Sequence, residues 1–227
     1  LLTEVPEAEG KVRVVPLGVS ALPEPQPRET LHALGIDRPF FLFVGTLEPR
    51  KNLNRLLEAY ASLPDNVRNG VRMAIAGGKG WGGVDVASIA AQLNISDRVH
   101  IVGHASDALL STLYVHALFL AMPSLYEGFG LPLVEAMAMG TPVLTSNCSS
   151  MPEVAGDAGL FVDPSDVNSI ANGLQALIMD RPLRQRLSGM ARITATRYSW
   201  EKAATATLQV FDEAIQVRKE KQCLPRR

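Results

Sequence analysis

Two short segments combine basic, acidic and glycine residues at spacings that suit a phosphorylated ligand. The first, residues 45–52, reads GTLEPRKN and contains Gly45 followed by the adjacent cations Arg50 and Lys51. Glycine lets a ligand approach the backbone closely, and cations near a helix N-terminus can hold an anion there. The alternative interpretation is two exposed basic residues in a solvated turn, and this segment alone favours neither.

The second segment, residues 123–135, places two glutamates around a glycine turn. Glu127 precedes Gly128 and Gly130, and Glu135 follows one helical turn into the next expected helix. Backbone N–H groups in such turns can cradle phosphate. We expect Glu127 to accept hydrogen bonds from sugar hydroxyls and Glu135 from a ribose diol. The alternative is a solvated loop carboxylate and a glutamate that suits the helix dipole.

Paired carboxylates also serve glycoside hydrolysis, which is therefore the competing chemistry. A neutral glycoside does not require cations, whereas a sugar attached to a diphosphate does. Departure of a diphosphate leaves negative charge that Arg50 and Lys51 are suited to stabilise. The two segments together favour an activated, diphosphate-linked sugar as substrate.

Other polar segments give weaker signals. The loop 76–83, AGGKGWGG, can close over a ligand, but a plain surface turn is the favoured interpretation, and it matches no Walker A pattern. A structural role is favoured for His104. No histidine pair or Asp-x-Asp pair has metal-ligand spacing, so no metal cofactor is expected.

The hydrophobic pattern predicts the elements that position these segments. Apolar runs alternate with stretches of helical periodicity, which is typical of a Rossmann-like α/β fold with a doubly wound parallel sheet. Ligands bind such sheets at the carboxyl ends of the strands. We expect strands at 11–15, 40–44, 71–76, 99–102, 117–122, 142–145 and 159–162. We expect helices at 30–34, 53–60, 86–93, 109–114, 132–139, 165–179 (with Ser165 as N-cap), 182–196 and 200–218.

The chain is expected to comprise three parts. Residues 1–27 are interpreted as a linker with one strand leading into the domain, residues 28–197 as the Rossmann-like ligand-binding domain, and residues 198–227 as a C-terminal helix with a basic tail. The chain begins with Leu, and we interpret it as a fragment of a longer protein.

Composition excludes several classes of partner. The net charge of −1 provides no long-range field for nucleic acid. The basic residues of 218–227 are interpreted as a solvated helix end, so at most peripheral membrane contact is expected. Cys148 and Cys223 predict no disulfide, which fits a reducing compartment, and no apolar run approaches the roughly 20 residues of a membrane span. A cytoplasmic location is expected, with a peripheral position at the inner membrane as the alternative.

The ordered set of motifs resembles glycosyltransferase family 4, whose members are retaining enzymes of the GT-B fold. The resemblance rests on residues 45–52, the E-x7-E spacing of 127–135, AMAMGTPV at 136–143 and PEVAGDAG at 152–159, and it covers roughly residues 11–212. It implies that Arg50 and Lys51 contact the donor diphosphate and that Glu127 contacts the donor sugar.

The same resemblance assigns the remaining contacts. It implies that the turn of Gly128, Phe129, Gly130 and Leu131 donates backbone N–H groups to sugar and phosphate. It also implies that Glu135 contacts the nucleotide ribose and that the base lies near Val102, Gly103 and His104. Many members carry Gly-Arg where this chain has Gly45-Thr46, so one phosphate contact differs. The segments look most similar to those of bacterial mannosyltransferases that use GDP-mannose.

GT-B enzymes have a second Rossmann-like domain that binds the acceptor, and only one such domain fits this chain. The resemblance therefore implies a donor-binding half of a hexosyltransferase, inactive alone, whose glycan or lipid-linked acceptor binds through a missing N-terminal domain. Two alternatives stay open. One is a non-catalytic nucleotide-sugar-binding module, and the other is a sugar-nucleotide epimerase of the same fold.

Overall fold

The chain divides into two compact units, and the larger one is built on a single parallel sheet. A computed structural model describes residues 5–223, with side-chain positions for all of these except Glu7 and residues 220–223. The larger unit is Ala21–Arg197, and the smaller one combines residues up to 20 with residues from 198 onward. The domain boundaries that the sequence predicts, at 27/28 and at 197/198, stay predictions.

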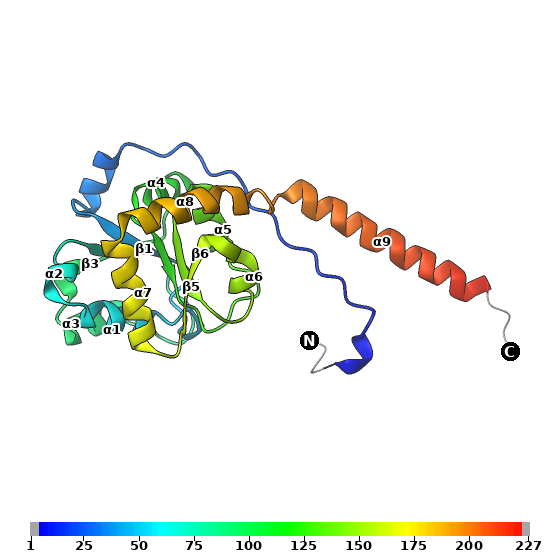
Figure 1. Cartoon of the computed structure of the whole chain (residues 1–227), viewed down its shortest axis with the longest axis horizontal. Coiled ribbons are helices and arrows are strands. Elements are labelled where there is room, and N and C mark those ends of the chain that lie inside the picture. Colours follow the sequence, from blue (N-terminus) through cyan, green and yellow to red (C-terminus); the bar gives the residue numbers. More distant parts are fainter. Residues whose placement is uncertain (1–4, 224–227) are drawn as a thin grey trace. The chain divides into compact units, whose positions relative to one another are not determined.

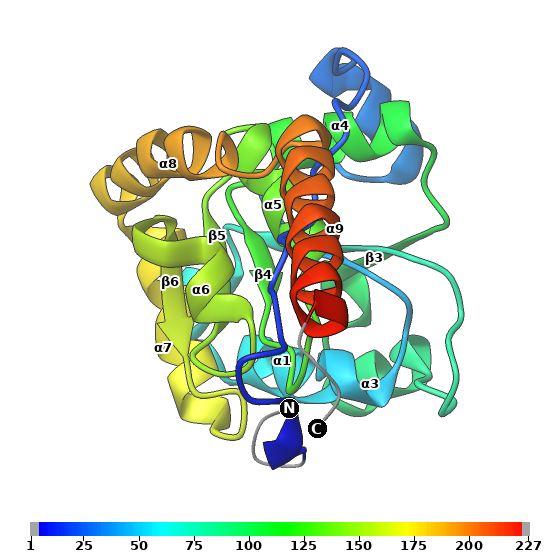
Figure 2. The same cartoon turned by 90° about the vertical axis from the view of Figure 1, so that its right-hand side faces the viewer.

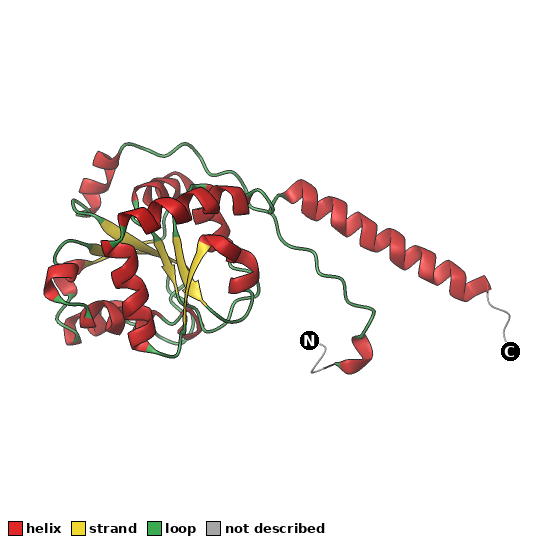
Figure 3. Ribbon diagram, viewed as in Figure 1, coloured by secondary structure: helices red, strands yellow, loops and turns green. Residues whose placement is uncertain are grey.

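Six parallel strands form the sheet of the larger unit in the order β3-β2-β1-β4-β5-β6 (Figure 3). This order is the doubly wound arrangement of dinucleotide-binding folds, and the predicted fold class is confirmed. The strands are β1 (Phe40–Val44), β2 (Arg72–Ala76), β3 (Val99–Gly103), β4 (Leu120–Met122), β5 (Val143–Ser146) and β6 (Gly159–Val162).

Helices cover both faces of this sheet (Figure 1). One face carries α1 (Leu53–Ser62), α2 (Asp65–Arg68), α3 (Val86–Gln92) and α7 (Val167–Met179). The other carries α4 (Asp107–His116), α5 (Leu131–Ala138), α6 (Met151–Ala155) and α8 (Arg181–Ala195). Short 3-10 helices are η2 (Arg28–Leu34), η3 (Pro49–Lys51), η4 (Ser96–Arg98) and η5 (Gly156–Ala158).

The central strands are buried on both faces, which explains their composition. All five residues of β1 are buried, as expected for a continuous apolar run between two helical layers. The ring of Phe41 stacks on Phe119 and meets the edge of Tyr60. Leu56 and Leu57 of α1 are fully buried against the same cluster. This packing fixes the position of the central strands, and with it the position of the loops at their carboxyl ends.

The sheet reverses its winding direction between β1 and β4. These strands are neighbours, but the chain leaves β1 towards β2 and leaves β4 towards β5. The loops that follow them therefore diverge and leave a crevice at the carboxyl ends, which is where ligands bind in such sheets. Both chemistry-bearing segments of the sequence follow these two strands.

The smaller unit differs from the prediction in one respect. Residues 11–15 were expected to form a strand, but residues 12–27 adopt no regular structure. The β-branched composition of the run is not sufficient, because a strand needs a partner and the side chain of Val14 is 77% exposed. The unit otherwise consists of η1 (Pro6–Ala8) and α9 (Trp200–Cys223), and Arg13 Nε donates to Glu213 Oε2 at 2.8 Å.

Most other predicted boundaries shift by one to a few residues. The strand expected at 117–122 begins at Leu120, and α7 is capped by Asp166 rather than Ser165. The carboxylate of Asp166 accepts a hydrogen bond from Asn168 N at 2.8 Å, whereas Ser165 N itself donates to Asp163 at 2.8 Å. Among the helices of residues 5–223, none is long and apolar enough to cross a membrane.

Candidate functional site

The two predicted motifs meet at the carboxyl ends of β1 and β4. Arg50 Nη1 lies 2.7 Å from Glu127 Oε2, and Lys51 Nζ lies 2.6 Å from Glu127 Oε1. Glu127 is 6% exposed and Lys51 is 5% exposed. An isolated charge at such a position would be costly, so the two side chains stabilise each other. The hydrogen bond and charge of Glu127 raise the pKa of Arg50, against the opposing effect of its burial.

Further hydrogen bonds fix Glu127 in this position. Ser124 Oγ donates to Glu127 Oε1 at 2.9 Å, and Glu127 N donates to Ser149 Oγ at 3.2 Å. Ser150 Oγ donates to the carbonyl oxygens of Glu127 and Phe129, at 2.9 and 3.2 Å. Both carboxylate oxygens and both backbone groups of Glu127 thus have partners, so its orientation is set by the loops after β4 and β5.

Residues 45–52 form a second, shallower ion pair beside the first. Arg50 Nε donates to Glu48 Oε2 at 3.0 Å, and Thr46 Oγ1 donates to Glu48 Oε1 at 2.8 Å. The hydrogen bond from Thr46 and the charge of Arg50 lower the pKa of Glu48. Gly45 lies against the stem of Lys51, because a Cβ there would be 3.3 Å from Lys51 Cε. The Thr46 hydroxyl therefore donates its hydrogen bond to Glu48, within the loop 45–52.

Arg50 and Lys51 lie in the 3-10 turn η3 rather than in the first turn of α1. This turn ends at Asn52, which has a left-handed φ of 60°. Asn52 Nδ2 donates to the carbonyl oxygens of Pro123 and Pro164, at 2.9 and 2.7 Å. Leu125 N donates to Arg50 O at 2.8 Å. Asn52 and Arg50 therefore tie the loop after β1 to the loop after β4.

The turn after Glu127 presents backbone donors. Gly130 has a φ of 99°, which side chains disfavour, and it precedes the first residue of α5. Among the described residues, the N–H groups of Gly128, Gly130 and Leu131 donate to no other protein group. Gly128 and Leu131 are exposed, and Phe129 is half-buried. This arrangement of free N–H groups at a helix start is suited to an anion.

Glu135 lies on α5, half-buried, next to Tyr114 of α4. Tyr114 hydroxyl donates to Glu135 Oε2 at 2.9 Å. Burial raises the pKa of Glu135, the Tyr114 hydrogen bond opposes this, and the charge of Asp107 adds to it. Burial also raises the pKa of Tyr114 well above its usual range. Within residues 5–223, no hydrogen bond or ion pair joins Glu135 to the Glu127 cluster.

Val102, Gly103 and His104 lie at the end of β3, at the edge of the sheet. The order β3-β2-β1-β4 puts β2 between this segment and the loop that carries Arg50. His104 is exposed, whereas Val102 is half-buried. Gly77 N donates to Gly103 O at 2.7 Å, which fixes the strand end. The segment lies on the same edge of the sheet as the cluster but does not contact it directly.

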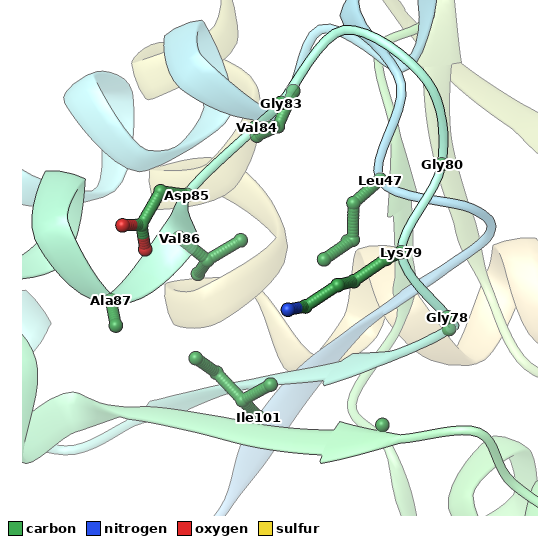
Figure 4. Close-up of a pocket in the computed structure, with 12 residues that line it drawn as sticks. Leu47, Gly78, Lys79, Gly80, Gly83, Val84, Asp85, Val86, Ala87 and Ile101 are labelled. Atoms are coloured by element: carbon green, nitrogen blue, oxygen red, sulfur yellow. The ribbon is translucent and has the colours of Figure 1, made fainter.

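The glycine loop 77–83 borders a separate pocket of about 530 Å³. Figure 4 shows the side chain of Lys79 pointing into this pocket, between the start of α3 and Ile101 of β3. Leu47 and Gly103 also line the pocket, and Leu47 N donates to Gly78 O at 3.0 Å. Trp81 is 65% exposed, so the loop is not folded over a ligand site here.

Several residues of the site gave no recognisable signal in the sequence. Ser124, Ser149 and Ser150 hold the Glu127 turn, and Tyr114 was interpreted only as part of a helix face. The three serines lie in loops that follow β4 and β5, so their position at the correct edge of the sheet was the one available clue. Among the described residues, no group of three or more histidine, cysteine or acidic side chains could hold a metal ion.

Comparisons with known proteins agree with this geometry. Residues 30–194 match the family model described as glycosyl transferases group 1. The O-antigen chain mannosyltransferase B of Escherichia coli is 37% identical over 172 residues, which are 76% of this chain and 45% of that protein.

Solved structures show the same architecture. A sucrose-phosphate synthase from Thermosynechococcus elongatus superposes with a TM-score of 0.75 at 28% identity, over 90% of this chain and 53% of that one. Anabaena HepE in complex with UDP-glucose is similar in fold, with a TM-score of 0.71 at 20% identity, over 85% and 54% of the two chains. The chain thus spans about half the length of these relatives. It belongs to the group 1 family of glycosyltransferases, and its fold is the Rossmann-like C-terminal domain of a GT-B architecture.

Proposed function

We propose that this chain binds the nucleotide-sugar donor of a retaining hexosyltransferase, with GDP-mannose as the favoured donor. The observation that carries the proposal is the convergence of Arg50 and Lys51 on Glu127 at the crevice between β1 and β4. The mannosyltransferase similar to this chain supports the sugar, and the UDP-glucose complex of a protein of the same fold supports the class of donor.

The diphosphate of the donor shares the two cations with Glu127. In ligand-bound form, Arg50 and Lys51 contact phosphate oxygens, and the free N–H groups of Gly128, Gly130 and Leu131 add donors on the other side. As the bond from the sugar to the diphosphate breaks, negative charge grows on the leaving oxygen. Fixed cations and N–H groups stabilise that charge without having to reorganise.

Glu127 has a different task from the cations. Its two oxygens accept from Ser124, Lys51 and Arg50, so the carboxylate is held in one orientation. A carboxylate held in this way accepts hydrogen bonds from sugar hydroxyls and orients the ring relative to the leaving group. Glu135 receives the ribose diol, and the base extends towards Val102–His104 in this proposal.

The proposal requires no metal ion, because the cations and backbone donors supply the positive charge. Acceptor binding is assigned to a part of the protein beyond this chain, and the acceptor is a glycan or a lipid-linked sugar. We expect the isolated 227 residues to bind donor and to transfer no sugar. Turnover on an acceptor by this chain alone would contradict that assignment.

Isothermal titration calorimetry of the folded chain with GDP, UDP, ADP and guanosine tests the proposal. We expect GDP to bind best and guanosine to bind at least about tenfold more weakly, because charge-assisted hydrogen bonds to the phosphates are lost. Equal affinity for GDP and guanosine would refute the role of Arg50 and Lys51. Tighter binding of UDP would refute the choice of donor base.

A further inference from the structure

A second cluster of cations lies at the amino ends of the strands, at the opposite edge of the sheet from Glu127. Residues that precede β4 and β5 form a pocket of about 420 Å³ together with α8, which packs against α5 (Figure 2). The lining residues include three arginines and no acidic side chain: Val115, Ala117, Leu118, Met139, Gly140, Thr141, Pro142, Arg181, Arg184, Gln185, Ser188 and Arg192.

Residues 136–143, AMAMGTPV, contribute one wall of this pocket. The proposed donor site does not use this segment. Gly140 follows the end of α5 with a φ of 76°. A Cβ on Gly140 would lie 2.3 Å from Arg192 Cζ, so the guanidinium of Arg192 rests on the glycine backbone. Ser188 Oγ donates to Gly140 O at 2.6 Å. These contacts hold α8 and the guanidinium of Arg192 against the wall.

Arg184 is fixed on the other side of the pocket. Its Nη1 donates to the carbonyl oxygens of Leu177 and Ile178, at 2.6 and 2.9 Å, at the C-terminal end of α7. Burial lowers the pKa of Arg184, and the charge of Arg181 adds to this effect. Arg181 and Arg184 line the same pocket, so their like charges disfavour each other there.

One carboxylate, Asp180, acts on these arginines, since its charge opposes the lowering of the pKa of Arg184. Asp180 Oδ1 accepts from Leu183 N at 2.8 Å as the N-cap of α8. No ion pair within residues 5–223 involves Arg181, Arg184 or Arg192. The hydrogen bonds to the C-terminal end of α7 explain the position of Arg184 alone. They give no reason for Arg181 and Arg192 to line the same pocket.

We propose that Arg181, Arg184 and Arg192 form a binding site for a phosphate dianion, distinct from the donor crevice. Guanidinium groups match the geometry of phosphate oxygens with paired hydrogen bonds. The hydroxyl of Ser188 and the amide of Gln185 add neutral donors, and Val115, Leu118 and Pro142 give room for a small apolar body on the phosphate. The ligand class is a phosphomonoester or inorganic phosphate.

The test follows backbone amide and arginine Nε resonances of the whole chain by NMR during titration at constant ionic strength. The probes are inorganic phosphate, glycerol 3-phosphate, and phosphatidylcholine vesicles with and without phosphatidic acid. We expect saturable shifts at Gly140, Thr141 and the arginine Nε groups. Saturation by the soluble phosphates identifies a free ligand. Response to the phosphatidic acid vesicles alone identifies a lipid headgroup.

Arg181→Gln and Arg192→Gln should each weaken the saturable binding about tenfold or more, since each removes a charge-assisted contact. Arg186→Gln is the matched control, because Arg186 is an exposed arginine of the same helix that does not line the pocket. Arg184 is left unchanged to preserve its bonds to α7. Shifts that rise linearly without saturation, equal weakening by Arg186→Gln, or shifts confined to Gly128 and Leu131 would each overturn the proposal.

Discussion

The two ends of the sheet hold cations in opposite ways. At the carboxyl ends, Lys51 and Arg50 are bound to Glu127, and Lys51 is 5% exposed. At the amino ends, Arg181 and Arg192 are exposed and make no ion pair in the described part of the chain. A buried ammonium needs a fixed carboxylate, whereas solvated guanidiniums do not.

This difference distinguishes a cluster whose geometry is fixed by ion pairs from one whose arginines make no ion pair in the described part of the chain. In the first cluster, a phosphate must share cations that already pair with Glu127. The orientation of the Arg50 and Lys51 side chains is therefore defined before the ligand arrives. In the second, a phosphate supplies the first ion-pair partner of Arg181 and Arg192. The substitutions below separate these two properties.

Removal of Glu127 is expected to have the largest effect on stability. In Glu127→Ala, the buried Lys51 loses its carboxylate, and we expect a loss of about 3 kcal/mol in the free energy of unfolding. Arg192→Gln, at the other end, should change it by less than about 0.5 kcal/mol. Urea denaturation measures both. Similar losses in the two variants would show that the clusters do not differ as described.

The two ends of α5 give a matched pair of glycines. Gly130 and Gly140 have φ values of 99° and 76°, and alanine at either position should cost about 1–2 kcal/mol in the free energy of unfolding. We expect Gly130→Ala to weaken GDP binding only, and Gly140→Ala to weaken phosphate binding at the arginine pocket only. Binding assays on both variants check this. A loss of both ligands in one variant would indicate a global rather than a local change.

The pH dependence of stability should report on Glu135, with a smaller effect. Because burial raises its folded pKa above the ordinary 4.5, the folded protein holds this proton more tightly than the unfolded chain. The resulting stabilisation is present below the ordinary pKa and is lost as pH rises through the folded pKa. The stability of the native protein relative to Glu135→Gln should therefore fall across this window. Parallel unfolding curves from pH 4 to 8 would contradict it.

Chelation of divalent metal ions is expected to have no effect on GDP binding. Positive charge in the donor crevice comes from Arg50 and Lys51, so EDTA should leave the calorimetric affinity for GDP unchanged. A loss of affinity that added Mg²⁺ restores would show that a divalent ion takes part.

The sequence predicted what depends on local pattern and failed where tertiary contacts decide. The strand Phe40–Val44 was predicted to the residue, because five consecutive apolar side chains suit a strand between two helical layers. The strand expected at 11–15 had suitable composition but no partner strand. The N-cap of α7 shifted by one residue, because Asp166 and Ser165 are both acceptable caps.

The same distinction applies to the sites. Arg50, Lys51 and Glu127 were identified because each follows a predicted strand and the ends of parallel strands share one edge. Ser149 and Ser150 were missed, since hydroxyls in a polar loop have no characteristic spacing. The arginine pocket was also missed, because residues 115–142 and 181–192 come together only when α8 packs on α5.

The most direct test of the central claim compares GDP with guanosine on three proteins: the native chain, Lys51→Met and Arg192→Gln. Lys51→Met should lose about 1.5–3 kcal/mol of GDP binding, roughly a ten- to 150-fold change, and should bind guanosine as before. Arg192→Gln should bind both like the native chain. Retained preference for GDP in Lys51→Met, or its loss in Arg192→Gln, would show that the nucleotide phosphates are not held at the crevice between β1 and β4.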